Sequence, residues 1–292
     1  MSMAPKSSTI EEEKCVQEYF DDNVRGWERM YDEQAFDTYN LFDSHTVIKR
    51  KEYVLQLLDE SKESRWRRVL DIGCGPGIYM VDLLQRGMDV WGVDVAPKMI
   101  EQAISTAKDM GLQSRVHFSV ASVENLPFPD EYFDVIICIG VLEYLSKDDL
   151  ALKEIYRVLK PHGIAIITIW NHLSLGTFMD LYSLIKVVGK KTYRLVFPLN
   201  SSDMKKQNEQ EFRKSYNVRR FDNLLQTHGL RKVNFISHRF GPIAINRKAI
   251  FSDATNIKIT EKIEKISKIR WVPLLRELGT MYIMRVEKTS KK

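Results

Sequence analysis

Between residues 68 and 170, short apolar runs rich in β-branched residues alternate with longer amphipathic stretches. The runs are apolar at nearly every position, which is typical of strands that are covered on both faces. The stretches between them have the spacing of helices that bury one side. Strands separated by helices in this way pair in parallel through right-handed crossovers. The sequence therefore predicts an α/β fold, with helices on both faces of a parallel sheet.

The expected elements follow the chain in a regular order. Helices are predicted to end near residue 84 and to cover 97–110, 147–159 and 218–228, and strands are predicted at 68–72, 89–94, 115–120, 133–139, 163–170, 233–237 and 281–286. After Trp170 the alternation stops for some 45 residues, and it is interrupted again at about 241–272. These two stretches are predicted to be insertions on the core that contain helices, because long loops without secondary structure are uncommon in compact domains.

Four regions are expected on this basis. Residues 1–60 are predicted to be an arm and helical lid, 61–172 a ligand-binding core, 173–216 a substrate-side insertion, and 217–292 the end of the core sheet with its second insertion. Residues 1–170 carry a net charge of −10 and residues 171–292 one of +15. A basic C-terminal part favours an anionic partner, although a lysine-rich face in contact with water gives the same pattern.

A glycine-rich turn at the first strand-to-helix junction carries the strongest local signal. The segment V-L-D-I-G-C-G-P-G covers residues 69–77 and brings flexible backbone close to any ligand bound there. Its G-x-G-x-G spacing is shorter than that of nicotinamide-dependent oxidoreductases. Asp94 ends the second strand, 23 residues after Asp71, at the position where a carboxylate accepts hydrogen bonds from ribose hydroxyls.

These residues belong to four motifs that stand in the order and spacing of a known family. The motifs are D-I-G-C-G-P-G, V-D-V-A-P-K-M-I, S-V-E-N-L-P-F-P-D-E-Y-F-D-V-I-I-C-I-G-V-L-E-Y-L and R-V-L-K-P-H-G. Together they resemble the class I S-adenosylmethionine-dependent methyltransferases, in the branch that includes quinone-biosynthesis and natural-product enzymes. The resemblance spans about residues 66–170. It implies a Rossmann-like seven-stranded sheet with an antiparallel last strand, and S-adenosyl-L-methionine as methyl donor.

The resemblance also implies a set of cofactor-binding residues. They are the glycine turn with Asp71, Gly73, Cys74, Gly75 and Gly77, the ribose ligand Asp94, the adenine contacts Val95 and Met99, and Ile139 and Gly140 beneath the sulfonium. The chain departs from the family at the adenine amino group, where Ala121, Ser122, Val123 and Glu124 replace the usual acidic residue before L-P-F. The Ser122 hydroxyl, the Glu124 carboxylate or a backbone group near Val123 takes that role.

Residues outside the cofactor motifs are candidates for acceptor binding and proton transfer. The aromatic residues Tyr19, Trp27 and Tyr31 lie in the lid region, where they would exclude water or simply pack on the core. His172 follows the fifth strand and is the first candidate for a base, followed by Glu143 and Tyr144. Some quinone O-methyltransferases have Glu-His at the last two positions for a metal, so the tyrosine here argues against a bound cation.

The predicted function is methyl transfer to O, N or C of a small-molecule acceptor that is hydrophobic, anionic or both. The basic insertions would roof a pocket, pack on the sheet or contact a membrane surface. Two alternatives remain: an RNA methyltransferase, which lacks the expected base-binding motifs here, and a binding protein that keeps the fold without turnover. Three distant cysteines support neither a disulfide framework nor a zinc cluster, and no apolar stretch approaches the roughly 20 residues of a spanning helix. We therefore expect a cytoplasmic protein.

Overall fold

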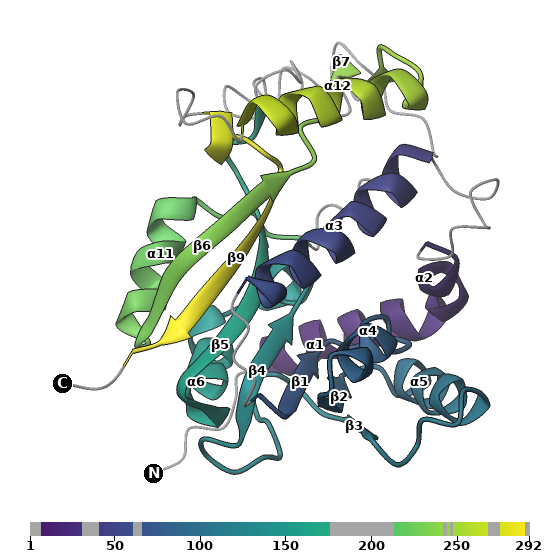
Figure 1. Cartoon of the computed structure of the whole chain (residues 1–292), viewed down its shortest axis with the longest axis vertical. Coiled ribbons are helices and arrows are strands. Elements are labelled where there is room, and N and C mark those ends of the chain that lie inside the picture. The colour runs from purple at the N-terminus through teal and green to yellow at the C-terminus, as the bar shows by residue number, and fades with distance from the viewer. Residues whose placement is uncertain are drawn as a thin grey trace.

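A single seven-stranded sheet forms the centre of the molecule (Figure 1). The computed structural model describes residues 7–30, 41–60, 66–175, 213–241, 244–245, 248–267 and 275–289. The strands, in spatial order, are β3 (Val116–Val120), β2 (Asp89–Asp94), β1 (Arg68–Ile72), β4 (Phe133–Cys138), β5 (Leu159–Trp170), β9 (Met281–Lys288) and β6 (Leu230–His238). Strands β3 to β5 pair in parallel, whereas β9 is antiparallel to both β5 and β6. The predicted mostly parallel sheet with an antiparallel last strand is confirmed.

Helices cover both faces of this sheet. They are α1 (Ser7–Asp22), α2 (Val24–Met30), α3 (Leu41–Asp59), α4 (Met80–Gln85), α5 (Pro97–Asp109), α6 (Asp148–Val158), α11 (Val218–Thr227) and α12 (Asp253–Ser267), with the short 3-10 turns η1 (Leu142–Tyr144) and η2 (Leu275–Glu277). Apolar residues of α6 and α11 pack on one face, and those of α3 and α4 on the other. Strand β4 is buried at all six positions, which explains its unbroken apolar run.

The aromatic N-terminal region forms two helices, α1 and α2. The break falls at Asn23, whose side chain donates to the carbonyl of Tyr19 at 2.7 Å and whose own carbonyl accepts from Gly26 and Trp27. Asn23 thus ends α1 and begins α2, because its hydrogen bonds satisfy backbone groups at both helix ends. The predicted lid residue Tyr31 lies outside the described residues.

Helix α12 packs on α3 through polar side chains, although isoleucine recurs along one of its faces. Its buried positions are Asn256, Thr260, Glu264 and Ser267, whereas Ile266 is 44% exposed. Glu264 accepts a hydrogen bond from the Tyr53 hydroxyl of α3 at 2.7 Å. Hydrogen bonding of this kind offsets the cost of removing polar groups from water, so helical spacing of apolar residues did not identify the buried side. The described part of the second insertion also includes the two-stranded pair β7 (Ala244–Ile245) and β8 (Lys248–Ala249).

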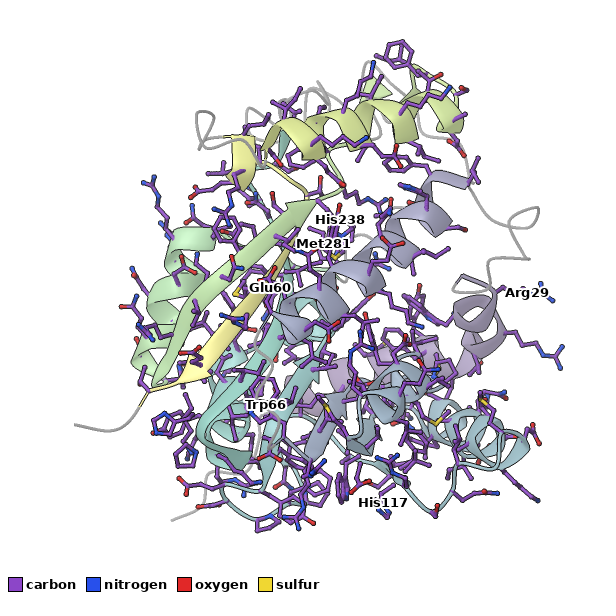
Figure 2. The ribbon with its side chains drawn as sticks, viewed as in Figure 1. Arg29, Glu60, Trp66, His117, His238 and Met281 are labelled. Atoms are coloured by element: carbon purple, nitrogen blue, oxygen red, sulfur yellow. The ribbon has the colours of Figure 1, made fainter. Side chains whose placement is uncertain are left out.

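His238 lies buried beneath α3, next to Met281 on the neighbouring strand (Figure 2). Its ring packs edge-on against Tyr53 with 5.6 Å between the ring centroids. Burial lowers the pKa of His238 well below its usual value, and the nearby guanidinium groups of Arg50 and Arg239 act in the same direction. The imidazole is therefore neutral in the folded protein, which bears on stability at low pH.

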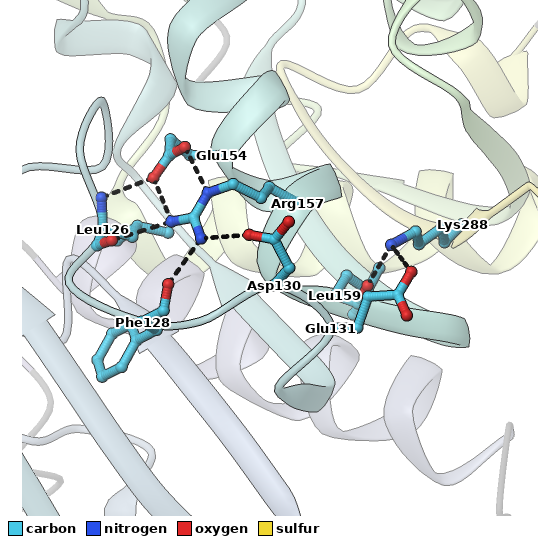
Figure 3. Close-up of polar contacts among 8 residues, drawn as sticks. All are labelled: Leu126, Phe128, Asp130, Glu131, Glu154, Arg157, Leu159 and Lys288. Carbon is cyan, nitrogen blue, oxygen red and sulfur yellow. Dashed lines mark hydrogen bonds and ion pairs between the residues drawn. The ribbon is translucent and has the colours of Figure 1, made fainter.

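The loop before β4 is tied to α6 by a single guanidinium (Figure 3). Arg157 donates to the carbonyl oxygens of Leu126 and Phe128 at 3.0 and 2.6 Å, and it pairs with Glu154 and Asp130. Glu154 in turn accepts from the backbone N–H of Leu126 at 2.8 Å. These bonds fix the L-P-F-P-D segment and with it the residues just before it, which border the cavity described next.

Candidate active site

A cavity opens at the carboxyl edge of the parallel strands, where the turns after β1, β2 and β4 meet the N-terminal helices. Ligands of open α/β sheets bind at this edge. Eleven of the predicted cofactor residues line it: Gly73, Cys74, Gly75, Asp94, Val95, Met99, Ser122, Val123, Glu124, Ile139 and Gly140. Asp71 and Gly77 do not line it. Asp71 is buried in β1, where burial and the neighbouring Asp94 raise its pKa.

The glycine turn holds the backbone in a conformation that side chains disfavour. Gly73, Gly75 and Gly77 have φ angles of +68°, +52° and +89°. A Cβ atom at Gly73 would lie 2.3 Å from Cγ2 of Val141, so both the backbone conformation and this close contact disfavour a side chain here. The turn is pinned to the next strand because the N–H groups of Gly73 and Cys74 both donate to the carbonyl of Val93. Bare backbone therefore forms this wall of the cavity.

Asp94 lies at the same edge and is 8% exposed, and each of its two carboxylate oxygens accepts one backbone hydrogen bond. One oxygen accepts from the N–H of Gly75 at 2.9 Å and the other from the N–H of Ala96 at 2.9 Å. Burial raises the pKa of this carboxyl group, and these backbone hydrogen bonds oppose the rise. A carboxylate has about four lone-pair sites, so each oxygen can accept a further hydrogen bond from a ligand in the cavity.

The region predicted to meet adenine combines apolar and acidic side chains. Met99 is buried at the start of α5, beside Gly75. The Ser122 hydroxyl accepts from the N–H of Glu124 at 3.3 Å. Burial and the nearby Glu13 of α1 raise the pKa of Glu124. Ser122, Val123 and Glu124 all border the cavity, so the three alternatives for an adenine partner all remain.

Glu143 is buried at the far end of the cavity, beyond Gly140. One of its oxygens, Oε1, accepts from the indole N–H of Trp170 at 3.1 Å, and Oε2 has no hydrogen-bond partner among the described residues. Burial raises the pKa of Glu143, whereas Arg213 and Arg50 oppose the rise. A buried carboxylate with a vacant acceptor position is unusual and points to a ligand or a proton as its missing partner.

Aromatic rings surround this end of the cavity. Phe20 of α1 lies 5.1 Å from Tyr144 and 5.7 Å from Trp27, measured between ring centroids. Trp27 lines the cavity, whereas Tyr19 contacts Phe20 instead. Helix α1 is held over the site because the N–H of Lys98 donates to its Asp21 carboxylate at 2.9 Å. The predicted lid thus covers the cavity, with Phe20 as an aromatic contact that sequence reasoning did not select.

Burial raises the pKa of the Tyr144 phenol, although Arg213 opposes the rise, so the hydroxyl stays protonated near neutral pH. Arg213 lies over the rings of Tyr144 and Trp170, with its guanidinium carbon 5.5 and 5.6 Å from their centroids. Its position is fixed by the next residues: the N–H of Lys214 donates to the carbonyl of Glu143 at 2.9 Å, and the Tyr216 hydroxyl donates to Leu142.

His172 is exposed and does not line the cavity. The fifth strand, β5, ends at Trp170. Backbone hydrogen bonding continues past its end, because the N–H of His172 donates to the carbonyl of Tyr216 at 2.8 Å. The imidazole then faces outward, with Nδ1 3.2 Å from the Ser215 hydroxyl. This geometry does not support the predicted role of His172 as the base, and Trp170 is the strand-end residue that faces the site.

Other reactive groups near the cavity are unsuited to catalysis. Cys74 and Cys138 are buried, and burial raises the pKa of both thiols, so neither is a ready nucleophile. The described residues include no group of three His, Cys, Asp or Glu side chains arranged to hold a metal ion. Within the same residues, no helix is both long and apolar enough to cross a bilayer.

Sequence reasoning missed two cations that border the cavity. Arg50 of α3 is 8% exposed, and a Cβ atom built on Gly140 would lie 3.7 Å from its Nη1 and also 3.7 Å from Oε1 of Glu143. Arg213 lines the cavity from the end of the first predicted insertion. Neither residue belongs to a motif. The only signal for them in the sequence is that arginine recurs in amphipathic segments, and this signal is not specific.

The strand order, in which the antiparallel β9 lies between β5 and β6, is that of the Rossmann-like methyltransferase fold. Residues 70–167 match the family model described as a methyltransferase domain. The chain is 40% identical over 98 residues to the sterol 4-C-methyltransferase of Caenorhabditis elegans, covering 34% of this chain and 29% of that protein. It is 26% identical over 177 residues to the ajmaline N-methyltransferase of Rauvolfia serpentina, covering 57% and 61%.

The similarity in structure extends over nearly the whole chain. The crystal structure of magnesium protoporphyrin IX methyltransferase from Synechocystis PCC 6803 superposes with a TM-score of 0.61 at 16% identity, covering 94% of this chain and 99% of that one. At this identity the likeness concerns the fold. The chain spans less than two thirds of the length of the two curated relatives.

Proposed function

We propose that this protein binds S-adenosylmethionine and transfers its methyl group to O, N or C of a small hydrophobic or anionic acceptor. The observation that carries the proposal is one cavity in which a bare-backbone turn and Asp94 meet a chamber walled by aromatic residues. The first part fits the adenosyl and methionyl parts of the donor, and the second provides an apolar, shielded place for an acceptor.

The residues present fit the cofactor. The glycine turn lets the donor approach the backbone where a Cβ would intrude, and Asp94 has acceptor capacity left for two ribose hydroxyls. Arg50 is placed to bind the methionine carboxylate, because its guanidinium lies beside Gly140. When bound, S-adenosylmethionine supplies a methyl carbon attached to a positively charged sulfur. The chain's own task is then to align and shield the acceptor, and alignment alone contributes about 7 to 11 kcal/mol in favourable intramolecular reactions.

Glu143 is the best candidate for a base. It lines the cavity, has a vacant oxygen among the described residues, and has a pKa raised by burial. A carboxylate of raised pKa takes up a proton more readily from an O–H or N–H acceptor. Tyr144 cannot fill this role in its protonated form, but its hydroxyl can donate to an acceptor oxygen. An acceptor carbon that is already nucleophilic needs Glu143 only to orient it.

The relatives support an apolar acceptor without deciding which atom is methylated. The two curated relatives are named for methylation of carbon on a sterol and of nitrogen on the alkaloid ajmaline. Both names describe ring systems, which suits the aromatic wall formed by Phe20, Trp27, Tyr144 and Trp170. The alignments cover only part of each chain, so the acceptor must be identified directly.

Calorimetric titration of the protein with S-adenosylhomocysteine tests the cofactor site. We expect one site per chain, and absence of binding would refute the proposal. Incubation with labelled S-adenosylmethionine and a small-molecule extract of the source organism then tests the transfer. Labelled product should appear in the low-molecular-weight organic fraction, whereas label confined to RNA would favour the nucleic-acid alternative.

A further inference from the structure

The charged groups that line the cavity divide it into two halves. Among the described residues, the adenosine half has the carboxylates of Glu13, Asp94 and Glu124, and it has no cation. The half beyond Gly140 has two guanidinium groups, Arg50 and Arg213, and one carboxylate, Glu143. The far half therefore has an excess of positive charge before any ligand enters.

Binding of the donor does not remove this excess. S-adenosylmethionine carries a positive sulfur, a positive amino group and a negative carboxylate, so its net charge is +1. Arg50 and the methionine carboxylate neutralise one another beside Gly140, which leaves the sulfonium, the amino group and Arg213 against Glu143 alone among the described residues. Burial raises the pKa of Glu143, which further weakens its ability to balance them. A charge in a poorly solvated site calls for a partner of opposite sign.

Arg213 is the cation placed to receive that partner. Its guanidinium carbon lies over two aromatic rings, 5.5 Å from the centroid of Tyr144 and 5.6 Å from that of Trp170. A planar guanidinium held in this way is restricted to one orientation, and it keeps donor edges free for a planar acid. Its Nε has no hydrogen-bond partner among the described residues, although the side chain also hydrogen-bonds Tyr144.

The surroundings of Arg213 specify the rest of the ligand. Phe20, Trp27 and Tyr144 form a continuous aromatic wall, with Phe20 in contact with both of the others. A flat apolar body fits against such a wall, because stacked and edge-on ring contacts add to the burial of apolar surface. An acidic group at one end of that body would reach the guanidinium.

We propose that Arg213 selects the acceptor by binding its acidic group, so that the protein accepts flat apolar molecules bearing a carboxylate or a similarly acidic oxygen. This inference rests on the proposed function, because it assigns the acceptor half of the same cavity. A purely structural Arg213 would instead serve only to hold Tyr144 and Trp170 in place. Its loss would then disturb charged and uncharged ligands equally.

Two fluorescent naphthalene compounds distinguish these roles. 8-Anilino-1-naphthalenesulfonate and N-phenyl-1-naphthylamine share one ring skeleton, and only the first carries a negative charge. The protein saturated with S-adenosylhomocysteine is titrated with each. We expect the wild-type protein to bind the sulfonate at least tenfold more tightly than the amine. Arg213→Gln should lose about tenfold in affinity for the sulfonate and less than twofold for the amine, and Arg213→Lys should recover part of the loss.

Arg220→Gln is the matched control, since Arg220 is exposed on α11 and does not line the cavity. It should leave both affinities unchanged. Equal losses for the two compounds in Arg213→Gln, or no preference for the sulfonate in the wild-type protein, would overturn the proposal. Titration with S-adenosylhomocysteine is run on every variant and should be unaffected. If the wild-type protein does not bind S-adenosylhomocysteine, the proposed function is refuted. The two naphthalene titrations, run without S-adenosylhomocysteine, would then still test Arg213.

Discussion

Replacement of Asp94 by alanine is the most direct test of the cofactor half of the cavity. The carboxylate accepts from the N–H groups of Gly75 and Ala96 at 2.9 Å each, and this leaves one side of each oxygen for a ribose hydroxyl. A hydrogen bond to a charged group contributes about 1.5 to 3 kcal/mol. At the lower value, two ribose bonds amount to about 3 kcal/mol, which corresponds to about a hundredfold increase in the dissociation constant.

Calorimetric titration with S-adenosylhomocysteine measures this loss. Asp89→Ala is the control, because Asp89 lies at the opposite end of β2 and forms an exposed ion pair with Arg115. It should bind within twofold of the wild-type protein, since exposed pairs contribute little. Asp94→Ala should also unfold at lower denaturant, because two backbone N–H groups lose their acceptor. A folded Asp94→Ala protein with wild-type affinity would show that Asp94 does not hold the ribose.

Three further predictions concern stability. Gly73→Ala should lower the free energy of unfolding by about 2 to 4 kcal/mol, because of left-handed strain and the close contact with Val141. Gly111 also has a φ of +68° but has open space around it, so Gly111→Ala should lower the free energy of unfolding by only about 1 to 2 kcal/mol. Urea denaturation compares the two variants, and equal losses would contradict the close contact at Gly73. Because the pKa of His238 is lowered by folding, stability should be complete above about pH 6.5 and should fall by up to about 1.4 kcal/mol per pH unit below it. Denaturant midpoints at several pH values test this, and His238→Phe should show a weaker slope between pH 6.5 and 5.5; the same slope in both proteins would assign the effect elsewhere. Arg157→Ala should lower the free energy of unfolding by about 2 to 3 kcal/mol, because it releases the loop from Leu126 to Asp130. The control Arg231→Ala, which removes an exposed ion pair with Glu287, should lower it by about 0.5 kcal/mol or less. A similar loss in the two variants would refute the role of Arg157.

The cofactor half of the site could be predicted because its residues are close to one another in the sequence. The glycine turn follows β1 directly and Asp94 ends β2, so strand boundaries alone bring them to one edge of the sheet. Parallel pairing of β1 and β2 then fixes the two ends side by side. The geometry found around Gly73 and Asp94 agrees with that reasoning, although their roles in binding remain predictions.

The acceptor half could not be predicted in the same way, because it depends on contacts between distant segments. Arg50 comes from a helix before the first strand and Arg213 from the end of the first predicted insertion, and no local pattern indicates that they meet at Gly140 and Trp170. His172 shows the limit of strand-end reasoning. Two additional residues of strand-like pairing were enough to turn its side chain away from the cavity.

The attachment of Arg213 to the core has a consequence for how this protein can diversify. Leu175 is held to the core because its N–H donates to the carbonyl of Leu278 at 2.8 Å, and Lys214 is held through the Glu143 carbonyl and an ion pair with Asp148 at 2.7 Å. Residues 176–212 are thus bracketed by two fixed points, the second of which immediately follows the guanidinium. Contacts with the core at Glu143 and Asp148 thus hold the residue next to Arg213, so chimaeras in which residues 176–212 are exchanged would test whether these contacts alone keep the guanidinium in place.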